Sequence, residues 1–591
     1  MVGRVVPDEP SPAHPEDSPY LPMQTLRRSN SLRFRIGVLF SILWLAASGE
    51  VPVKVVPVTG AHGMVVAGHP QATQAGLATL QAGGNAIDAA VAVSLALGVA
   101  EPYGSGLGGK LMLLYYEASS GKTYAVEAMD AAGSLNVAAY LRRPEEDHSY
   151  GYGAVGVPGL AAGLWMAHEK WGKLKWADDV APSIKLARDG FEILPKTREF
   201  FAEQEKKLRR GDAEIARLYL PEGQLPAAGS RLANADLAHT LELVAQHGRD
   251  GFYRGPVAEA IVSAAQKGGG ALTPDDLAHY EAHLVEPIGI DFRGYHLWSS
   301  PPPTNGAPLF LAIMKVLEDD TFAGSLRSPG NLDRIGRVWH EVQPLVQRGS
   351  GDAPEARFNF EKLVAPDSIE AIRLKVRAAA EPGRKVAAWD ASGADESALA
   401  ATTHFLVADA AGNIVCATQS QSLHFGAGVV PPGTGVVLNN SMSNFAFSEP
   451  GGVNYVAPGR RPRSTIAPTI VFRGGRPVLA LGIPGASRIP TALLQALLDR
   501  LAFDRPLAEA IGDTRVHFDY NWRTREESFE AERSFPAADA EALRALGWKV
   551  DLPEAAGAGH VFGGINAIEF TPGGGYTGYA DPRRTNAAAG Y

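Results

Sequence analysis

Apolar positions in the first part of the chain recur at helical spacing and are separated by glycine-rich breaks. Residues 72–80 carry apolar side chains three or four positions apart until Gly83 and Gly84 end the pattern, which predicts an amphipathic helix. Asn85 then stands at a helix N-cap position, before an alanine-rich segment that is apolar on every side and is therefore expected to be buried. The run Leu111–Tyr116 follows a glycine-rich loop and is typical of a strand.

The middle of the chain, from Gly156 to about Glu381, is mostly helical by pattern, with glycine and proline at the breaks. The expected helices cover residues 160–171, 176–189, 235–246, 256–267, 274–280 and 307–317. The stretch from Gly383 to Ala401 is small, polar and poorly periodic. It predicts an exposed linker.

After the linker the pattern changes to the two-residue alternation of strands. Residues 405–408 and 414–418 alternate about a turn at 409–413, which indicates a β-hairpin. Further strands are expected at 436–438, 470–472 and 478–481, and helices at 491–501 and 506–511. Strands in both halves with helices between them predict an α/β protein of stacked sheets with helical outer layers.

Composition and charge narrow the class of protein. The chain has 591 residues, 45% of them hydrophobic and 20% charged, which is enough to bury a large core. A net charge of −9 without a long basic run outside the N-terminus argues against nucleic-acid or anionic-membrane surfaces and favours small substrates as partners. The single cysteine, Cys416, excludes a disulfide framework, and His404, His424 and His560 lack metal-ligand spacing. Neither a metal nor a cofactor is expected.

Residues 1–49 have the layout of an upstream extension followed by a secretory signal peptide. Arginines cluster at 27–35 before an apolar run from Ile36 to Ala47, which ends in small residues. The run is shorter than the roughly 20 residues that span a bilayer. We therefore expect a periplasmic or secreted protein without a stable membrane span.

The sharpest candidate for chemistry is the point where the linker meets a strand, at Ala401–Phe405. A threonine hydroxyl is a weak nucleophile, but a chain cut before Thr402 would place a free α-amine within reach of its own Oγ. An α-amine has an ordinary pKa near 8 and can accept the hydroxyl proton. From these five residues alone, the favoured interpretation is that Thr402 and Thr403 are ordinary β-formers at the start of a strand.

Ordered motifs along the chain resemble those of the γ-glutamyltranspeptidase family. They are AGHPQATQAG, GGNAIDAAVAVSLALGVAEP, VGVPGLAAGLW, GFYRGPVAEAI, TTHF, PGTGVVLNNSM, RPRSTIAPTIV and GIPGASRI. The resemblance implies an αββα sandwich of the N-terminal nucleophile hydrolase type and a precursor that cuts itself. It also implies a large subunit of residues 50–401 and a small catalytic subunit of residues 402–591.

The resemblance assigns catalytic roles residue by residue. Thr402 matches the nucleophile and Thr403 the second threonine of the motif. Ser420 stands where the family has a threonine that hydrogen-bonds the amine of the nucleophile. Gly485 and Ala486 match the pair whose backbone N–H groups form the oxyanion hole, where one donor contributes roughly 3–4 kcal/mol at the transition state.

At several expected substrate-binding positions the side chain either keeps the functional group found in the family or replaces it. Ser464 and Thr465 match a serine pair that binds the substrate carboxylate, and both keep a hydroxyl. Ser441 stands in place of a glutamine, and Ser422 in place of an asparagine that contacts the substrate. These four positions are expected to line the acyl site.

Both charges that would recognise a zwitterionic substrate are replaced. Met129 stands where the family has the arginine that clamps the α-carboxylate, and Asn444 where an aspartate holds the α-ammonium. A charge-assisted hydrogen bond contributes about 1.5–3 kcal/mol, so γ-glutamyl binding should suffer. Arg357, Lys362 or Arg373 is a candidate for a compensating cation.

Three functions remain open from the sequence. The first is a γ-glutamyltransferase or glutathione-hydrolase-like amidohydrolase that acts through an acyl-threonine after autoproteolysis. The second is an acylase on the same scaffold that takes a non-zwitterionic, glutaryl-like acyl group, as in the related cephalosporin acylases. The third is a noncatalytic homologue that binds a peptide or small molecule.

Overall fold

Two seven-stranded antiparallel sheets form the centre of the computed structural model, which describes residues 53–379, 400–521, 526–552 and 562–591. Sheet A runs in the order β1 (Val58–Gly60), β18 (Tyr576–Ala580), β17 (Asn566–Phe570), β13 (Arg476–Gly482), β12 (Thr469–Arg473), β9 (Tyr295–Ser299) and β8 (Ile288–Phe292). Sheet B runs in the order β19 (Ala587–Gly590), β2 (Met64–Ala67), β10 (Ala400–Ala408), β11 (Ile414–Leu423), β3 (Lys110–Glu117), β4 (Lys122–Ala128) and β7 (His283–Val285).

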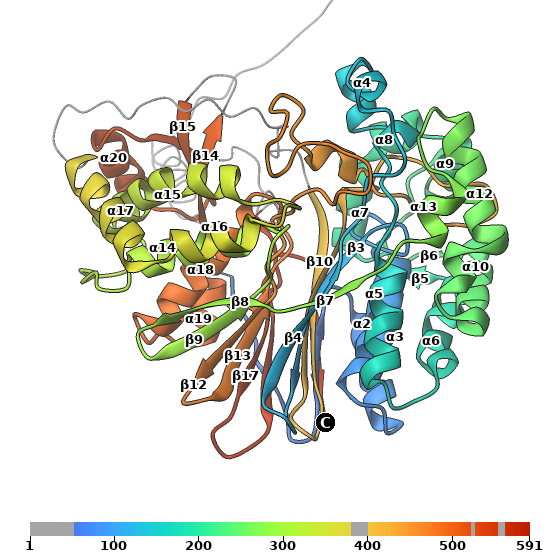
Figure 1. Ribbon diagram of the computed structural model, residues 1–591. Coiled ribbons are helices and arrows are strands. Elements are labelled where there is room, and N and C mark those ends of the chain that lie inside the picture. The colour runs from blue at the N-terminus through green and yellow to red at the C-terminus, as the bar shows by residue number, and fades with distance from the viewer. Residues whose placement is uncertain (1–52, 380–399, 522–525, 553–561) are drawn as a thin grey trace, which may run out of the picture. The chain divides into compact units, whose positions relative to one another are not determined.

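Helices from the first half of the chain pack on sheet B (Figure 1). The helices of this half are α2 (Pro70–Gln81), α3 (Ala86–Ala100), α4 (Val137–Tyr140), α5 (Leu160–Trp171), α6 (Trp176–Asp189), α7 (Pro195–Glu203), α8 (Glu205–Arg210), α9 (Ala213–Tyr219), α10 (Ala235–His247), α11 (Asp250–Tyr253), α12 (Gly255–Lys267) and α13 (Pro274–Ala278). A short two-stranded sheet, β5 (Phe191–Glu192) with β6 (Arg231–Leu232), lies among them in sequence. One apolar cluster joins α2, α3, α5 and α6 to sheet B.

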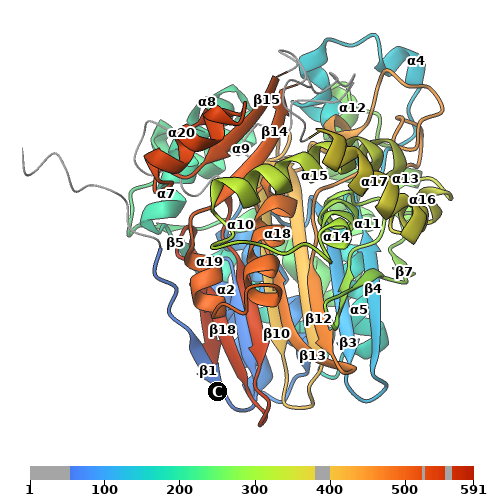
Figure 2. The ribbon, with the colours of Figure 1, turned by 90° about the vertical axis from the view of Figure 1, so that its left-hand side faces the viewer.

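Later helices pack on sheet A, where Figure 2 shows α14, α15, α18 and α19 in front of the strands. The remaining helices are α14 (Gly306–Val316), α15 (Pro329–Gly349), α16 (Ala356–Leu363), α17 (Pro366–Ala379), α18 (Arg488–Leu501), α19 (Leu507–Gly512) and α20 (Ala537–Ala545). A three-stranded sheet contains β14 (Val516–Asn521), β15 (Glu526–Ala531) and β16 (Lys549–Asp551). A separate apolar cluster contains side chains of both large sheets, such as Leu406 and Ile470. The predicted α/β class is confirmed.

Helix α3 shows why the sequence pattern specifies a buried element. Asn85 accepts hydrogen bonds from the backbone N–H groups of Ile87 and Asp88, and Asp88 accepts one from the N–H of Asn85. This capping box satisfies amides that the first helical turn leaves unpaired. Because α3 is apolar all round, it is buried along nearly its whole length between α2, α6 and β10.

The pattern-based elements agree closely with the structure in the helices and less well elsewhere. Helices α5 and α6 have the predicted bounds. The predicted strand at 436–438 is wrong, because this segment bonds to neighbouring loops and forms no ladder. The mostly helical middle region also supplies β8 and β9 to sheet A, which the pattern did not predict.

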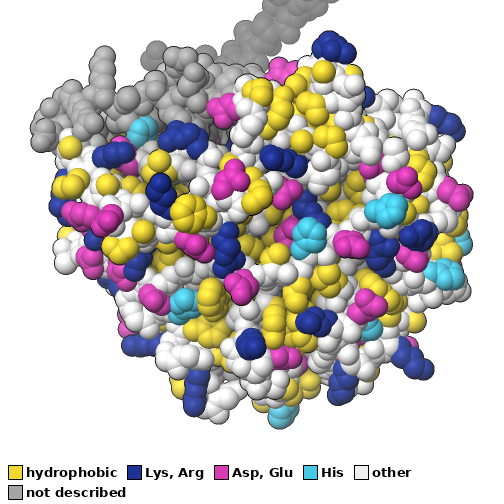
Figure 3. Space-filling model, in the orientation of Figure 1, with side chains coloured by type: hydrophobic (Ala, Val, Ile, Leu, Met, Phe, Trp, Pro, Cys, Tyr) yellow, Lys and Arg dark blue, Asp and Glu magenta, His cyan; other side chains and the backbone are white. Residues whose placement is uncertain are grey.

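Residues 383–399 of the predicted linker and the predicted signal segment lie outside the described residues. The prediction is wrong for the end of the linker, because Ala400 and Ala401 belong to β10 and Ala401 is buried. Within the described ranges, no helix is long and apolar enough to cross a membrane. Acidic and basic side chains are interspersed over the face that Figure 3 shows.

Candidate active site

Thr402 lies near the start of β10, at an irregularity in the pairing with β11. Ala401 faces Ser422, whereas Thr403 faces Gln419. Two residues of β11 therefore stand opposite Thr402 alone, which is the arrangement of a β-bulge. A bulge redirects side chains locally, and here it brings the hydroxyl of one β11 residue, Ser420, to Thr402.

The hydroxyls of Thr402 and Ser420 meet at the carbonyl of Ala401. Thr402 Oγ1 lies 3.1 Å from Ser420 Oγ and 2.6 Å from the Ala401 carbonyl oxygen. Ser420 Oγ also donates to the same carbonyl oxygen, and the N–H of Ser422 donates to Ser420 Oγ at 3.0 Å. Ser420 can thus accept the Thr402 proton while it donates its own proton to the carbonyl. Thr402 is 5% exposed, so bulk water has little access to it.

A buried charged network lies behind Thr402. Arg584 Nη1 donates to the carbonyl oxygen of Thr402 at 3.3 Å. Glu101 Oε1 accepts hydrogen bonds from Tyr103 at 3.0 Å and from Thr585 at 3.1 Å. Burial raises the pKa of Glu101, while hydrogen bonding to Thr403 and the charge of Arg584 oppose that rise. The motif GGNAIDAAVAVSLALGVAEP covers Glu101, but the sequence pattern gave neither Glu101 nor Arg584 a role at the nucleophile.

Three predicted substrate-binding residues form one connected group. Ser422 Oγ lies 2.8 Å from Ser441 Oγ, and the side-chain amide of Asn444 donates to Ser422 Oγ at 3.3 Å. Since Ser422 also touches Ser420 through its N–H, this group continues directly from the hydroxyl of Thr402. Its members come from the end of β11 and from the short 3₁₀ turn Ser441–Asn444.

Lys110, at the start of β3, completes this group, although the sequence analysis did not single it out. Its Nζ donates to Ser422 Oγ at 2.5 Å and to Ser441 Oγ at 2.8 Å, and it lies 3.8 Å from Asp130 Oδ2. Ser441 in turn donates to Asp130 at 2.5 Å. Burial lowers the pKa of Lys110, and burial raises the pKa of Asp130 to about 7 against the pull of Lys110. Lys110 could have been noticed in the sequence, because it is a lysine directly after a glycine-rich loop in an otherwise apolar strand.

The predicted oxyanion-hole residues follow the C-terminal end of β13, an interior strand of sheet A. The backbone of Ala486 has φ 53° and that of Ser422 has φ 77°, so two predicted site residues hold the left-handed conformation that costs a non-glycine residue of order 1–3 kcal/mol. No acceptor among the described residues takes the N–H of Gly485 or Ala486. Strain of this kind clusters at functional sites.

Ser464 and Thr465 lie just before β12 and beside the start of α14. The Ser464 carbonyl accepts a hydrogen bond from the N–H of Asn305 at 2.8 Å. Because β12 and β13 are antiparallel neighbours with Thr469 opposite Leu481, Ser464 and Gly485 both lie beyond the same end of these two strands. Cys416 of β11 contacts this end, with its Sγ 3.5 Å from the carbonyl oxygens of both Thr469 and Leu481.

The surroundings of Met129 and of the candidate compensating cations differ from those of Lys110. The Met129 side chain is fully buried in the apolar cluster of sheet A and its helices. Arg357 donates to the carbonyls of Glu286 and Pro287, and Arg373 donates to the carbonyl of Val316. Lys362 is exposed on α16. Lys110 is therefore the cation that the described structure places at Ser422.

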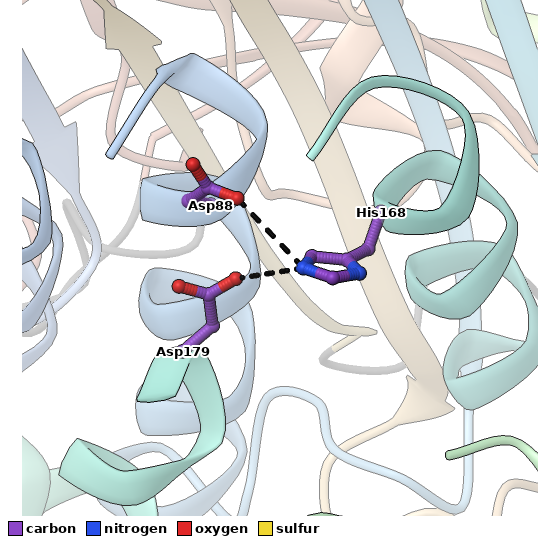
Figure 4. A group of neighbouring side chains, drawn as sticks. All are labelled: Asp88, His168 and Asp179. Atoms are coloured by element: carbon purple, nitrogen blue, oxygen red, sulfur yellow. Dashed lines mark ion pairs between the residues drawn. The ribbon is translucent and has the colours of Figure 1, made fainter. Parts of the chain in front are cut away.

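A second cluster of titratable groups joins three helices of the sheet B side. His168 of α5 points between Asp88 of α3 and Asp179 of α6 (Figure 4), with its Nε2 3.8 Å and 3.3 Å from their carboxylates. The geometry could hold a metal ion. However, Asp88 already caps α3 and accepts the N–H groups of Lys173 and Leu174. We interpret the cluster as an ion-paired junction between helices.

Comparison with known proteins gives the same family along nearly the whole chain. The family model described as gamma-glutamyltranspeptidase matches residues 72–591. The chain is 32% identical over 557 residues to the glutathione hydrolase proenzyme of Bacillus subtilis (strain 168), covering 90% of this chain and 92% of that protein. It is 35% identical over 537 residues to the acylase ACY 1 proenzyme of Pseudomonas sp. (strain SE83), covering 89% of this chain and 92% of that protein.

A solved structure supports the match in three dimensions. The crystal structure of cephalosporin acylase from Bacillus halodurans superposes with a TM-score of 0.81 and 27% identity, covering 92% of this chain and 98% of that chain. The family match, the two relatives and the solved structure indicate the same family as the sequence motifs, one of which contains Thr402. The chain belongs to the gamma-glutamyltranspeptidase family.

Proposed function

We propose that the chain is a precursor that cuts itself between Ala401 and Thr402, and that the freed Thr402 is the nucleophile of an acyl-transfer amidohydrolase. One observation carries this proposal: the Thr402 and Ser420 hydroxyls lie 3.1 Å apart at the carbonyl of Ala401. Thr402 Oγ1 attacks the Ala401 carbonyl carbon while Ser420 accepts its proton. The C–N bond then breaks, and water hydrolyses the resulting ester to leave an Ala401 carboxylate and a free Thr402 amine.

The freed amine supplies the base that the unsplit chain lacks. With an ordinary pKa near 8, it accepts the Oγ1 proton as the hydroxyl attacks a substrate amide. The N–H groups of Gly485 and Ala486 stabilise the oxyanion, the amine product leaves, and water or an amine acceptor takes the acyl group from Thr402. In this proposal residues 50–401 and 402–591 are the two subunits of an αββα sandwich, and residues 1–49 direct export.

The acyl donor has two candidates. The names of the relatives, glutathione hydrolase and acylase, support a γ-glutamyl donor and a simpler acyl donor respectively. The site favours the second, because Asn444 presents a neutral amide and the Met129 side chain is buried in an apolar cluster. A donor without a free α-amine does not need the aspartate that Asn444 replaces, and a donor without an α-carboxylate does not need the arginine that Met129 replaces.

Turnover of chromogenic anilides tests the proposed activity. Wild type, Thr402→Ser and Thr402→Ala would be compared on γ-glutamyl, glutaryl and pentanoyl anilides. Wild type should hydrolyse at least one of them and pass through an acyl-enzyme on Thr402 that intact mass detects after rapid quenching. Thr402→Ser should keep part of that activity and Thr402→Ala none. A wild-type protein that splits no anilide and carries no acyl group would favour the noncatalytic homologue.

A further inference from the structure

Lys110 presents a buried ammonium beside the residues expected to bind the acyl group. The side chain is 1% exposed, and its Nζ contacts Ser422 Oγ and Ser441 Oγ at 2.5 and 2.8 Å. Ser422 is 8% exposed and Asn444 half-buried, so these two residues form the accessible end of the group. A ligand that touches them meets the electrostatic potential of Lys110 directly behind them.

The charge of Lys110 is only partly compensated. Its carboxylate partner, Asp130, lies 3.8 Å away, beyond hydrogen-bond distance. One carboxylate oxygen of Asp130 accepts a hydrogen bond from Ser441 at 2.5 Å, and the other accepts one from the N–H of Gly159 at 3.3 Å. Ser441 therefore uses its proton on Asp130, and Ser422 is left to accept from Lys110 and from Asn444. Lys110 and Asn444 both donate to Ser422 Oγ, and among the described residues no carboxylate is within hydrogen-bond distance of this oxygen.

We propose that Lys110 is a specificity-determining cation of the acyl site, which excludes acyl groups with a free α-amine and selects acyl groups that end in a carboxylate. The protein thus carries its own ammonium where a cationic substrate group would otherwise be held. The preferred donor is a half-amide of a dicarboxylic acid, of which a glutaryl amide is the simplest match. The inference rests on the proposed function, because the role of Thr402 places the acyl group next to Ser422.

The positions of the hydroxyls support this orientation. Ser420 Oγ lies 3.1 Å from the Thr402 hydroxyl and accepts the N–H of Ser422 at 3.0 Å, and the side chain of Ser422 continues to Lys110. An acyl group bonded to Thr402 and lying along Ser422 would extend toward Lys110. A carboxylate there gains an attractive charge in a poorly hydrated environment, whereas an ammonium meets a like charge.

Ligand binding to the purified split protein tests the inference without turnover. Calorimetric titrations would compare glutarate, L-glutamate and pentanoate, which share the carbon chain and differ in charge. Wild type should bind glutarate at least tenfold more tightly than either of the others. Lys110→Met should reduce the preference for glutarate over pentanoate to less than threefold, and Lys110→Arg should retain more of it. Lys185→Met, at a side chain that is 79% exposed, is the charge-matched control and should behave as wild type.

The outcomes separate this inference from the proposed function. Equal binding of L-glutamate and glutarate by wild type, binding of none of the three ligands, or an unchanged preference in folded Lys110→Met would overturn it. If Lys110→Met does not fold because Asp130 loses its partner, Lys110→Met with Asp130→Asn removes both charges, and the wild-type comparison stands without any variant. Selective glutarate binding with no anilide turnover would contradict only the proposed chemistry. Turnover of pentanoyl and glutaryl anilides with equal kcat/KM would contradict only the role of Lys110.

Discussion

The imidazole of His404, on β10 of sheet B, packs directly against the backbone of Gly482, at the end of β13 of sheet A. A β-carbon at position 482 would lie closer than 3.0 Å to the ring. The ring is fully buried, its Nδ1 lies 2.8 Å from Thr418 Oγ1, and burial lowers the pKa of His404 to about 3. This neutral contact fixes the end of sheet A that leads to Gly485 against the end of sheet B that carries Thr402.

Gly482→Ala should therefore destabilise the fold and slow self-cleavage. Overpacking of a core costs about 1–3 kcal/mol, and the His404 ring has no exposed side toward which to move. Urea unfolding of the variant checks the free energy of unfolding. Gly330→Ala is the control, because nothing lies within 4 Å of a β-carbon there in α15, and it should be neutral or stabilising. Equal stability of Gly482→Ala and wild type would show that the sheets adjust at this contact.

Ser420→Ala should slow the cut before Thr402 by about a hundredfold or more, the usual contribution of a positioned proton acceptor. The reason is that Ser420 links the Thr402 hydroxyl to the Ala401 carbonyl. Gel analysis of freshly purified precursor over time measures the rate. Ser420→Thr keeps the hydroxyl and should cut much faster than Ser420→Ala. Normal cutting by Ser420→Ala would assign the proton transfer to another group.

Arg584→Met should slow self-cleavage several-fold and lower the free energy of unfolding by about 1–3 kcal/mol, the cost of leaving a buried polar group without its partner. The variant loses the contact to the Thr402 carbonyl and leaves Glu101 without its cation. Adding Glu101→Gln removes the uncompensated carboxyl, so the double variant should be more stable than Arg584→Met alone. Additive losses in thermal unfolding would mean that the two charges do not interact.

The junction of α3, α5 and α6 predicts a pH dependence of stability. Burial raises the pKa of Asp179 to about 6; burial alone would lower the pKa of His168, but the carboxylates of Asp179 and Asp88 raise it. Both groups bind protons more tightly in the folded state, so both stabilise the fold in acid. The contribution of Asp179 is lost as the pH rises through about 4–6, and that of His168 is lost as the pH rises past the ordinary histidine range near 6.5.

Asp179→Asn removes this contribution. The stability difference between wild type and the variant should shift against wild type by about 1–3 kcal/mol between pH 4 and pH 8. Urea unfolding across that range measures it, and exposed Asp178→Asn serves as the neighbouring control. A difference that is constant with pH would mean that Asp179 does not change its protonation on folding.

Regular elements with a full amphipathic pattern could be read from the sequence. Helices α5 and α6 have the predicted bounds because glycine, proline and charged residues mark their ends. The hairpin of β10 and β11 was found through its alternation and turn. Strands β8 and β9 were missed because they are short and lie between helices. The segment 436–438 is apolar and buried without being a strand, which periodicity cannot distinguish.

The candidate site was only partly accessible to sequence reasoning. The family resemblance singled out Thr402, Ser420 and Ser422, which stand on the two paired strands β10 and β11. Lys110 approaches Ser422 from 312 residues away, so only the packing of β3 against β11 brings them together. Alignment placed Met129 at the position of the family's carboxylate-binding arginine, and in the structure its side chain lies in an apolar cluster.

Intact mass spectrometry of the purified protein tests the central claim most directly. Wild type should give two chains whose masses place the cut between Ala401 and Thr402, and Thr402→Ala should give one chain without activity. The N-terminus of the heavier chain would at the same time show whether residues 1–49 are removed. A wild-type protein that remains a single unsplit chain, or that is cut elsewhere while it hydrolyses amides, would contradict the account of Thr402 as a self-freed nucleophile.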